Sequence, residues 1–269
     1  MADPQRRLAL VTGASAGLGE AFAHAYARRG LDVALTARRK DRLEALADKL
    51  RTDYGVSAYA IPADLSHWEA HAAILQAVAA EGRRVDVLVN NAGFGVPQTY
   101  LRAPWARHRE FLMTLVVNAC GLAYGAAEHM VEAGGGSIIN VASLAGFAPG
   151  AAGHTLYPAA KSFAIKFSQS LDAELRGKGV KVTALCPGFT KTEFNQAAGT
   201  EHLMAQAPRM FWQTAEQVVE AGIRANAKGR VVEVPAWWNK LAVLAMTTLP
   251  EPIVAAAVRR GAAKYQLQE

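Results

Sequence analysis

The sequence predicts an α/β fold in which helices cover both faces of a doubly wound parallel sheet. Short apolar runs alternate with helical stretches along most of the chain, which is the pattern of such a sheet. Neither a proline-rich linker nor an internal repeat interrupts this alternation. The 269 residues, of which 51% are hydrophobic, suffice to bury one full core. We therefore expect a single domain over residues 1–269.

The first strand, turn and helix are typical of a dinucleotide-binding site. An apolar run at Leu8–Val11 suits a strand buried on both faces, and apolar residues at helical spacing follow from Ala21. Glycines between them let a pyrophosphate approach the free amides at the start of the helix. A loop without a ligand is the weaker alternative, because the strand and the helix that the fingerprint requires are both present. The expected contacts are Gly13, Ser15, Ala16, Gly17, Leu18 and Gly19.

The second expected strand, Asp32–Ala37, ends at two arginines. Sites that prefer NAD place an acidic residue about 20 positions beyond the glycines, where it binds the ribose. Arg38 and Arg39 take that place here, and a guanidinium binds a ribose 2′-phosphate through two charge-assisted hydrogen bonds. The sequence therefore predicts a preference for NADP(H). The alternative is a solvated basic start to the next helix, because Lys40 and Arg42 follow.

Further apolar runs predict the remaining strands. Asn90 follows the run Val85–Val89, at the carboxyl edge where ligands bind in open parallel sheets. A helix is expected over Phe111–Val131 and contains Asn118. Asparagine has a low helix propensity, so its presence inside a helix indicates a specific role. Other strands are expected at Ala58–Ile61, Ser137–Ala142 and Val231–Val234, the last preceded by a helix with a capping box of Thr214 and Gln217.

Tyr157 and Lys161 stand one helical turn apart. Side chains at this spacing share a helix face, so the ammonium stabilises the tyrosine phenolate and lowers a pKa that is ordinarily about 10. The tyrosine then becomes a usable acid or base near neutral pH. Pro158 places the pair near the start of its helix, because proline is tolerated in a first turn. The spacing alone also occurs by chance, and the other motifs give it weight.

Several motifs follow one another in a recognisable order: TGASAGLG at Thr12, NNAG at Asn90, Asn118, Ser143, YPAAK at Tyr157 and PG at Pro187. In this order they resemble the short-chain dehydrogenase/reductase family, over a stretch that runs from Leu8 to Gly188. The resemblance implies a Rossmann-type sheet of seven strands in the order 3-2-1-4-5-6-7. Ala160 departs from the serine that many relatives have before the lysine, but it transfers no proton.

The resemblance implies a catalytic site that interconverts a carbonyl compound and an alcohol by hydride transfer. Tyr157 would exchange the proton with the substrate oxygen, and Lys161 would lower its pKa and bind the nicotinamide ribose. Ser143 would polarise the substrate carbonyl, with a simple strand cap as the alternative. Asn118 would hold a water that relays protons from Lys161 to solvent. Its alternative is a buried amide satisfied by the backbone.

The resemblance also implies where the cofactor lies. Asp64 would face the adenine amino group, and it also suits the N-cap region of the next helix together with Ser66. Asn90 is the better candidate for contact with the cofactor, whereas Asn91 suits a structural turn. The contacts implied beyond the glycine turn and the arginines are Asp64, Leu65, Asn90, Ala92, Gly93, Tyr157, Lys161, Pro187, Gly188, Thr190 and Thr192.

The net charge of +6 does not predict a nucleic-acid partner. Basic pairs beginning at Arg6, Arg83 and Arg259 are scattered along the chain, so we interpret them as solvated surface. Cys120 and Cys186 make no disulfide framework and suit small core residues, and no cluster has the spacing of metal ligands. The chain enters its first strand almost at once, so we expect no signal peptide and a cytoplasmic protein.

The last third of the chain carries the substrate information. Residues 189–213 look irregular and rich in apolar side chains, so they form either a lid over an apolar substrate or a loop pinned to the core. Residues 235–269 form an apolar extension. Its apolar segment, Leu241–Leu249, is cut by Pro250 and Pro252 and is too short and too interrupted to span a membrane. This extension would pack on a partner subunit or over the cleft, or would rest on a membrane surface. The resemblance implies a homodimer or homotetramer.

The predicted function is an NADP(H)-dependent oxidoreductase that acts on a small-molecule ketone, aldehyde or alcohol. Two alternatives remain: a non-catalytic NADP-binding regulatory protein, and an NAD-dependent alcohol dehydrogenase of the same fold. Loss of a catalytic residue would favour the regulatory protein. Asn118, Ser143, Tyr157 and Lys161 are all present.

Overall fold

A seven-stranded parallel sheet forms the centre of the computed structural model, which describes residues 6–263 except 97, 151, 154 and 194–207. The strand order is β3-β2-β1-β4-β5-β6-β9, and every pairing is parallel. The predicted fold class and strand order are confirmed. The strands are β1 (Leu8–Thr12), β2 (Asp32–Ala37), β3 (Ala58–Pro62), β4 (Val87–Asn90), β5 (Gly136–Val141), β6 (Val180–Leu185) and β9 (Val232–Glu233).

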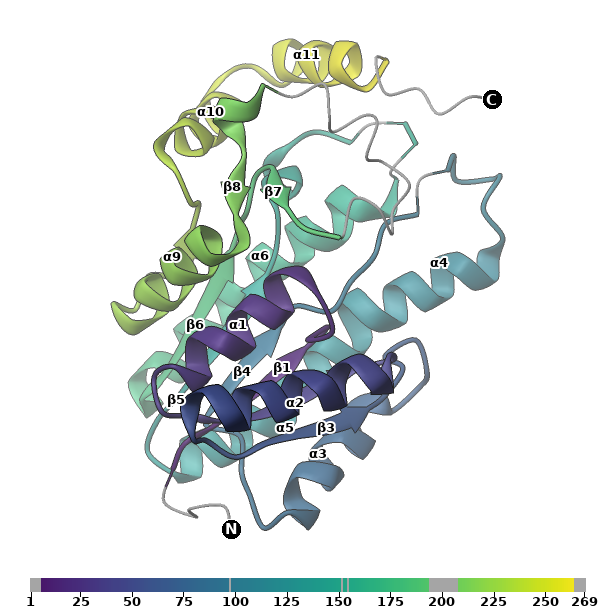
Figure 1. The fold of residues 1–269 in the computed structure, drawn as a ribbon. Helices are drawn as coiled ribbons and strands as arrows, with labels where there is room; N and C mark the ends of the chain where they lie inside the picture. The colour runs from purple at the N-terminus through teal and green to yellow at the C-terminus, as the bar shows by residue number, and fades with distance from the viewer. Residues whose placement is uncertain (1–5, 97, 151, 154, 194–207, 264–269) are drawn as a thin grey trace.

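Helices cover both faces of this sheet because its strands are apolar on both sides. In β1, Ala9 and Val11 pack into one apolar cluster, whereas Leu8 and Leu10 pack into another on the opposite face. The first cluster includes residues of α1 (Gly17–Ala27), α2 (Lys40–Tyr54) and α9 (Ala215–Ala227). The second includes residues of α3 (Ala70–Ala80), α5 (Asn118–Glu132) and α6 (Leu156–Leu175). Figure 1 shows α1 and α2 in front of the sheet.

The helix expected over Phe111–Val131 is longer and less regular than predicted. It begins as α4 (Trp105–Leu112), passes through a π-helical segment, η1 (Met113–Val117), and continues as α5. The whole stretch of 28 residues is apolar enough by composition to cross a membrane, with a mean hydropathy of 1.4 over its most apolar window. Core packing accounts for this composition, because Phe111, Leu122 and Met130 are almost completely buried inside the protein.

A buried ion pair joins the start of β2 to the segment between α3 and β4. Arg83 Nη1 lies 2.6 Å from Asp32 Oδ2, and both side chains are almost completely removed from solvent. The second Asp32 oxygen accepts a hydrogen bond from the Ser57 amide, and Arg83 also donates to the carbonyl of Arg6. The interpretation of the pair at Arg83 as solvated surface is therefore wrong for Arg83. Its charge is compensated by a carboxylate 51 residues away in the chain.

The segment expected to be a lid or pinned loop has short strands at its two described ends. β7 (Thr190–Lys191) pairs in parallel with β8 (Gln213–Thr214), and residues 194–207 of the segment lie outside the described residues. The predicted capping box begins α9: the Thr214 hydroxyl accepts from the Gln217 amide, and the Gln217 side chain accepts from the Thr214 amide. Within the described residues, the other short helices are η2 (Leu144–Phe147), η3 (Arg176–Lys178) and η4 (Arg209–Phe211).

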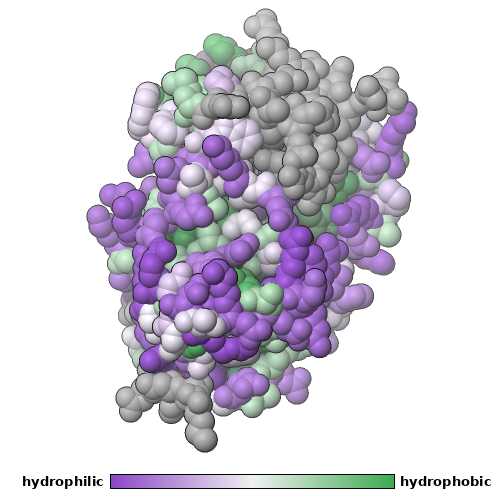
Figure 2. All heavy atoms as spheres, in the orientation of Figure 1, coloured by the Kyte–Doolittle hydropathy of each residue, from purple (hydrophilic) through white to green (hydrophobic). Residues whose placement is uncertain are grey.

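The predicted apolar extension begins with two helices, α10 (Trp237–Thr248) and α11 (Glu251–Ala263). Asn239 anchors the start of α10, because its buried amide donates to Pro235 and to Gln213. Trp237, Leu241 and Leu244 of the same helix are each more than half exposed. Figure 2 shows hydrophilic residues over much of the lower part of the visible face, whereas hydrophobic residues gather near the top, where α10 and α11 lie in Figure 1.

Candidate active site

A cleft of about 730 Å³ opens along the carboxyl ends of the central strands. It brings together the first glycine turn, the end of β2, the turn after β4 and the start of α6. Most of the site residues predicted from the sequence line it: Gly13, Ser15, Ala16, Gly17, Leu18, Arg38, Arg39, Asp64, Leu65, Ala92, Gly93, Ser143, Tyr157, Lys161, Pro187, Gly188, Thr190 and Thr192. Gly19, Asn90 and Asn118 are absent from this lining.

The glycine turn presents unprotected backbone amides to this cleft. α1 begins at Gly17, and its N-cap residue, Ala16, provides no side-chain hydrogen bond to the first turn. The amides at the start of α1 are thus available to an anion and are reinforced by the positive end of the helix. Gly19 does not line the cleft, and its role is in packing. A Cβ atom there would lie 2.2 Å from the Gly13 carbonyl oxygen. Only glycine lets α1 approach the turn this closely.

Arg38, Arg39 and Asp64 line the cleft at the ends of β2 and β3. Arg39 is held against the glycine turn, because its Nε and Nη2 donate to the Ser15 hydroxyl at 3.1 and 2.9 Å. Burial pushes the pKa of Asp64 upward, but hydrogen bonds from Ser66 and the nearby Arg38 charge outweigh it and leave that pKa below its ordinary value. Asp64 bonds the Ser66 amide without capping α3, which begins later, at Ala70.

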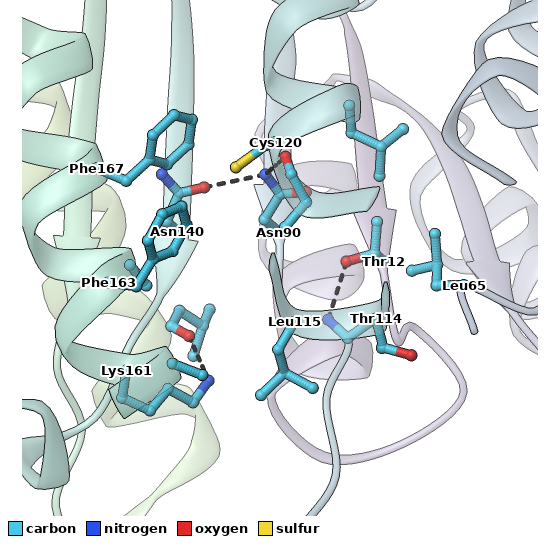
Figure 3. Close-up of a pocket in the computed structure, with 16 residues that line it drawn as sticks. Thr12, Leu65, Asn90, Thr114, Leu115, Cys120, Asn140, Lys161, Phe163 and Phe167 are labelled. Carbon is cyan, nitrogen blue, oxygen red and sulfur yellow. Dashed lines mark hydrogen bonds between the residues drawn. The ribbon is translucent and has the colours of Figure 1, made fainter. Parts of the chain in front are cut away.

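Asn90 is the last residue of β4, and Asn91 follows it, but the two side chains have different surroundings. Asn91 lines the cleft, and its amide donates to the Thr12 and Gly13 carbonyls, so it fastens the glycine turn to β4. Asn90 points beneath the cleft into a small cavity of about 30 Å³, where its amide donates to Asn140 Oδ1. Figure 3 shows Asn90 and Asn140 directed toward each other across this cavity. Asn91 therefore has the structural role expected for it, whereas Asn90 does not line the cleft, because neighbouring side chains along a strand face opposite ways.

Ser143 and Tyr157 meet inside the cleft. Ser143 follows β5 and is the N-cap of η2, where its hydroxyl accepts a hydrogen bond from the Ala145 amide. The side chain thus caps this short helix and not the strand. Burial raises the pKa of the Tyr157 hydroxyl, and a hydrogen bond with Ser143 partly opposes this rise. The net direction is opposite to the one expected from the helical spacing. Tyr157 therefore keeps its proton at neutral pH.

Lys161 lies beside Tyr157 but is turned toward the sheet. Its Nζ donates to the Val141 carbonyl at 2.7 Å and lies 5.6 Å from the centre of the Tyr157 ring. Figure 3 shows the side chain reaching this carbonyl. Only 8% of the residue is exposed, and burial lowers the pKa of its ammonium to about 8. Lys161 therefore loses much of its charge only slightly above neutral pH.

Asn118 lies at the junction of η1 and α5 and is completely buried. Its Nδ2 donates to the Leu65 and His67 carbonyls, and its Oδ1 accepts from the His71 amide. These bonds tie α5 to the segment before α3. They match the alternative of an amide satisfied mainly by the backbone. The π-helical turn just before Asn118 shifts the hydrogen-bond register of the backbone, a distortion often found at functional sites.

One wall of the cleft was not predicted from the sequence. Arg107 of α4 stacks over the Phe94 ring at 4.0 Å and pairs with Glu110 at 2.8 Å, and all three line the cleft. Val258 of α11 lines it from the opposite end of the chain. The i, i+3 spacing of Arg107 and Glu110 was the available signal. Nothing local marks Val258, because only the packing of α11 brings it to the cleft.

The segment after β6 lies against the glycine turn. A Cβ atom at Gly17 would lie 3.1 Å from the Thr192 side chain, and Thr190 donates to the Gly188 carbonyl. Cys186, at the end of β6, is fully buried as expected. Cys120 is only partly buried and lines the small cavity that contains Asn90.

Comparison with known proteins agrees with this geometry. The family model described as short chain dehydrogenase matches residues 7–203, most of the chain. This chain belongs to the short-chain dehydrogenase family. As a member of that family it is an oxidoreductase, in agreement with the names of its relatives.

Two curated relatives of this short-chain dehydrogenase are sufficiently similar to be informative. An "Uncharacterized oxidoreductase" of Myxococcus xanthus is 36% identical over 260 residues, which cover 97% of this chain and 99% of that protein. A "Sulfoacetaldehyde reductase" of Chromohalobacter salexigens is 35% identical over 219 residues, which cover 75% of this chain and 85% of that protein.

Solved structures share the fold along nearly the whole chain. A short-chain dehydrogenase from Sphingobium yanoikuyae in complex with NADPH superposes with a TM-score of 0.78 at 29% identity, covering 98% of this chain and 97% of that one. The "bulky-bulky ketone specific alcohol dehydrogenase" from Comamonas testosteroni superposes with a TM-score of 0.75 at 27% identity, covering 98% and 95%. The short-chain dehydrogenase architecture thus extends into the two C-terminal helices.

Proposed function

We propose that this short-chain dehydrogenase interconverts a ketone or aldehyde with the corresponding alcohol, with NADP(H) as cofactor and Tyr157 as the acid or base. One observation carries the proposal. The Tyr157 and Ser143 hydroxyls, joined by a hydrogen bond, share one cleft with Lys161 and with the uncapped start of α1. A proton donor and an anion-binding helix end therefore open onto the same space.

The residues at the cleft fit a phosphorylated nicotinamide dinucleotide. The free amides at Gly17 and Leu18 suit the pyrophosphate, and Arg38 and Arg39 supply guanidinium groups for a ribose 2′-phosphate. Relatives of known structure support the choice of NADP(H), because the Sphingobium protein was solved with NADPH. When bound, the cofactor supplies or accepts the hydride.

Tyr157 and Ser143 would handle the substrate oxygen. In the reductive direction the oxygen gains negative charge as the carbon is reduced, and both hydroxyls are placed to donate hydrogen bonds to it. The raised pKa of Tyr157 keeps its proton available near neutral pH, as this direction requires. Tyr157 then transfers the proton, and Ser143 stabilises the phenolate that remains. In the oxidative direction the same phenolate accepts the alcohol proton.

Lys161 would act on Tyr157 through charge and not through a direct hydrogen bond. Its ammonium lies 5.6 Å from the tyrosine ring and is fixed by the Val141 carbonyl. At that position an ammonium would favour the phenolate form, against the larger effect of burial on the pKa of Tyr157. The amide of Asn118 is occupied by Leu65, His67 and His71, so this side chain has no free donor for a relay water.

The described walls of the cleft favour an apolar substrate. Phe94, Leu115, Leu144, Pro149 and Phe189 line the same cleft as Ser143 and Tyr157. Apolar walls with a few convergent polar groups are typical of small-molecule sites. The similar enzyme from Comamonas testosteroni, whose name says that it is specific for bulky-bulky ketones, supports this choice. We therefore propose a ketone or aldehyde with apolar substituents.

Cofactor binding and turnover test this proposal separately. NADPH and NADH are titrated by nicotinamide fluorescence, and a panel of ketones and aldehydes is then followed at the nicotinamide absorbance. We expect Tyr157→Phe to bind NADPH normally and to lose about 10²- to 10⁴-fold in turnover, because the ring remains and the proton donor is removed. Ser143→Ala, which truncates only the hydroxyl, should also bind the cofactor and lose turnover. A Tyr157→Phe protein with normal turnover contradicts the mechanism, and cofactor binding without turnover on the whole panel favours a regulatory protein.

A further inference from the structure

A carboxylate from a distant part of the chain lies in the basic corner of the cleft. Glu193 follows β7, and its Oε2 lies 2.9 Å from Arg42 Nη1 and 3.5 Å from Arg39 Nη1. Its Oε1 accepts another hydrogen bond from Arg42, at 3.2 Å. Glu193 and Arg39 both line the cleft. The carboxylate therefore occupies the place beside Arg39 that the sequence assigns to a ribose 2′-phosphate.

The orientation of Arg39 makes this contact important. Its Nε and Nη2 are both bound to Ser15, through the hydroxyl at 3.1 and 2.9 Å and through the carbonyl at 3.2 Å. Nη1 is the remaining nitrogen of the guanidinium, and Glu193 is its partner. An anion that binds Arg39 through Nη1 must therefore displace the Glu193 carboxylate or lie next to it.

The carboxylate is ionised at neutral pH. Hydrogen bonds from Arg42, and then the charges of Arg42 and Arg39, outweigh the effect of burial and hold the pKa of Glu193 below its ordinary value. Both ion pairs are about half exposed, with 44% of the Arg39 side chain and 50% of the Glu193 side chain accessible. A pair of this exposure is weak enough for a ligand to exchange.

We propose that Glu193 is a specificity-determining residue that weakens NADP(H) binding by competing with the ribose 2′-phosphate for Arg39. This inference rests on the proposed function. A 2′-phosphate brings like charge to the carboxylate, whereas NAD(H) carries a neutral hydroxyl at the same position and meets no such repulsion. Glu193 therefore reduces the preference of the site for NADP(H) over NAD(H).

The test compares dinucleotide binding by the wild-type chain, Glu193→Gln and Glu44→Gln. Glutamine keeps the shape of the side chain and removes the charge. Glu44 is a matched control, because it is a glutamate of α2 whose ion pair is with Lys40, at 3.5 Å. Its carboxylate is not paired with Arg39 or Arg42 in this ion pair. Nicotinamide fluorescence gives dissociation constants for NADPH and NADH at low and at high salt.

We expect Glu193→Gln to lower the dissociation constant for NADPH about three- to tenfold and to leave that for NADH nearly unchanged. The gain should shrink at high salt, because the competing charges are exposed. Glu44→Gln should leave the ratio of the two constants at the wild-type value.

Three results would overturn the inference. The NADPH-to-NADH ratio could stay at the wild-type value in Glu193→Gln, or it could change equally in Glu44→Gln. Alternatively, Glu193→Gln could lose affinity for NADH, which would show that the carboxylate accepts a hydrogen bond from the ribose hydroxyl. A wild-type chain that binds neither dinucleotide would refute the proposed function itself and is distinguishable from all three.

Discussion

Replacing Lys161 by methionine should make the folded protein more stable at neutral pH, by an amount that disappears in alkali. Methionine has a similar length and no charge. Only 8% of the Lys161 residue is exposed, and burial lowers the pKa of its ammonium from 10.5 to about 8. One pKa unit corresponds to about 1.4 kcal/mol, so the burial of this charge costs the folded state about 3 kcal/mol below pH 8.

The sign of the pH dependence follows from proton binding. Between pH 8 and 10.5 the unfolded chain holds the Lys161 proton more tightly than the folded chain does, so the free energy of unfolding of the wild type rises with pH. Lys161→Met lacks this rise, whereas all other groups titrate in both proteins. The stability advantage of Lys161→Met is therefore full at pH 7 and decreases through this window.

Urea unfolding of the cofactor-free proteins, followed by tryptophan fluorescence at pH 7, 8, 9 and 10, measures this difference. Lys166→Met is the control, because Lys166 is an exposed lysine on the same helix. We expect the difference between Lys161→Met and wild type to fall by about 2 to 3 kcal/mol from the lowest to the highest pH. A constant difference over this range would refute the reasoning that the ammonium is desolvated.

Three further predictions concern the framework of the site. Gly19→Ala should lower the free energy of unfolding by about 1 to 3 kcal/mol or more, because the new Cβ would lie 2.2 Å from the Gly13 oxygen; Gly150→Ala, where nothing lies within 4 Å, is the control, and equal stability of the two variants would contradict the contact. Asp32→Asn should cost about 3 to 5 kcal/mol in urea unfolding, because it leaves the buried Arg83 without a counter-ion; a loss below about 1 kcal/mol would mean that this pair is solvated. Thr214→Ala should cost about 1 kcal/mol through loss of the capping box, and an unchanged unfolding midpoint would argue against it.

The sequence by itself determined the architecture and much of the candidate site, because both depend on local patterns. Apolar runs predict strands, and the glycine turn between Leu8–Val11 and the following helix requires the geometry that the structure shows. The spacing of Tyr157 and Lys161 places both on the first turns of α6, and both line the cleft. The capping box of α9 is equally local.

Tertiary structure decided how these side chains are partnered. Lys161 binds the Val141 carbonyl and is desolvated, so burial and not helical spacing sets the pKa values of the pair. The side chain of Asn118 donates its hydrogen bonds to the segment before α3, and Arg83 is buried against Asp32. Such partners come from distant segments, and their effect on charge depends on how much solvent the packing excludes.

The contact of Glu193 with Arg42 spans 151 residues and is the clearest case. Neither residue has a local pattern that predicts the other. The β7–β8 pairing and the packing of the segment after β6 on the glycine turn bring them together. Periodicity and spacing report the conformation of one segment, whereas the electrostatics of the site depends on which segments the folded chain places side by side.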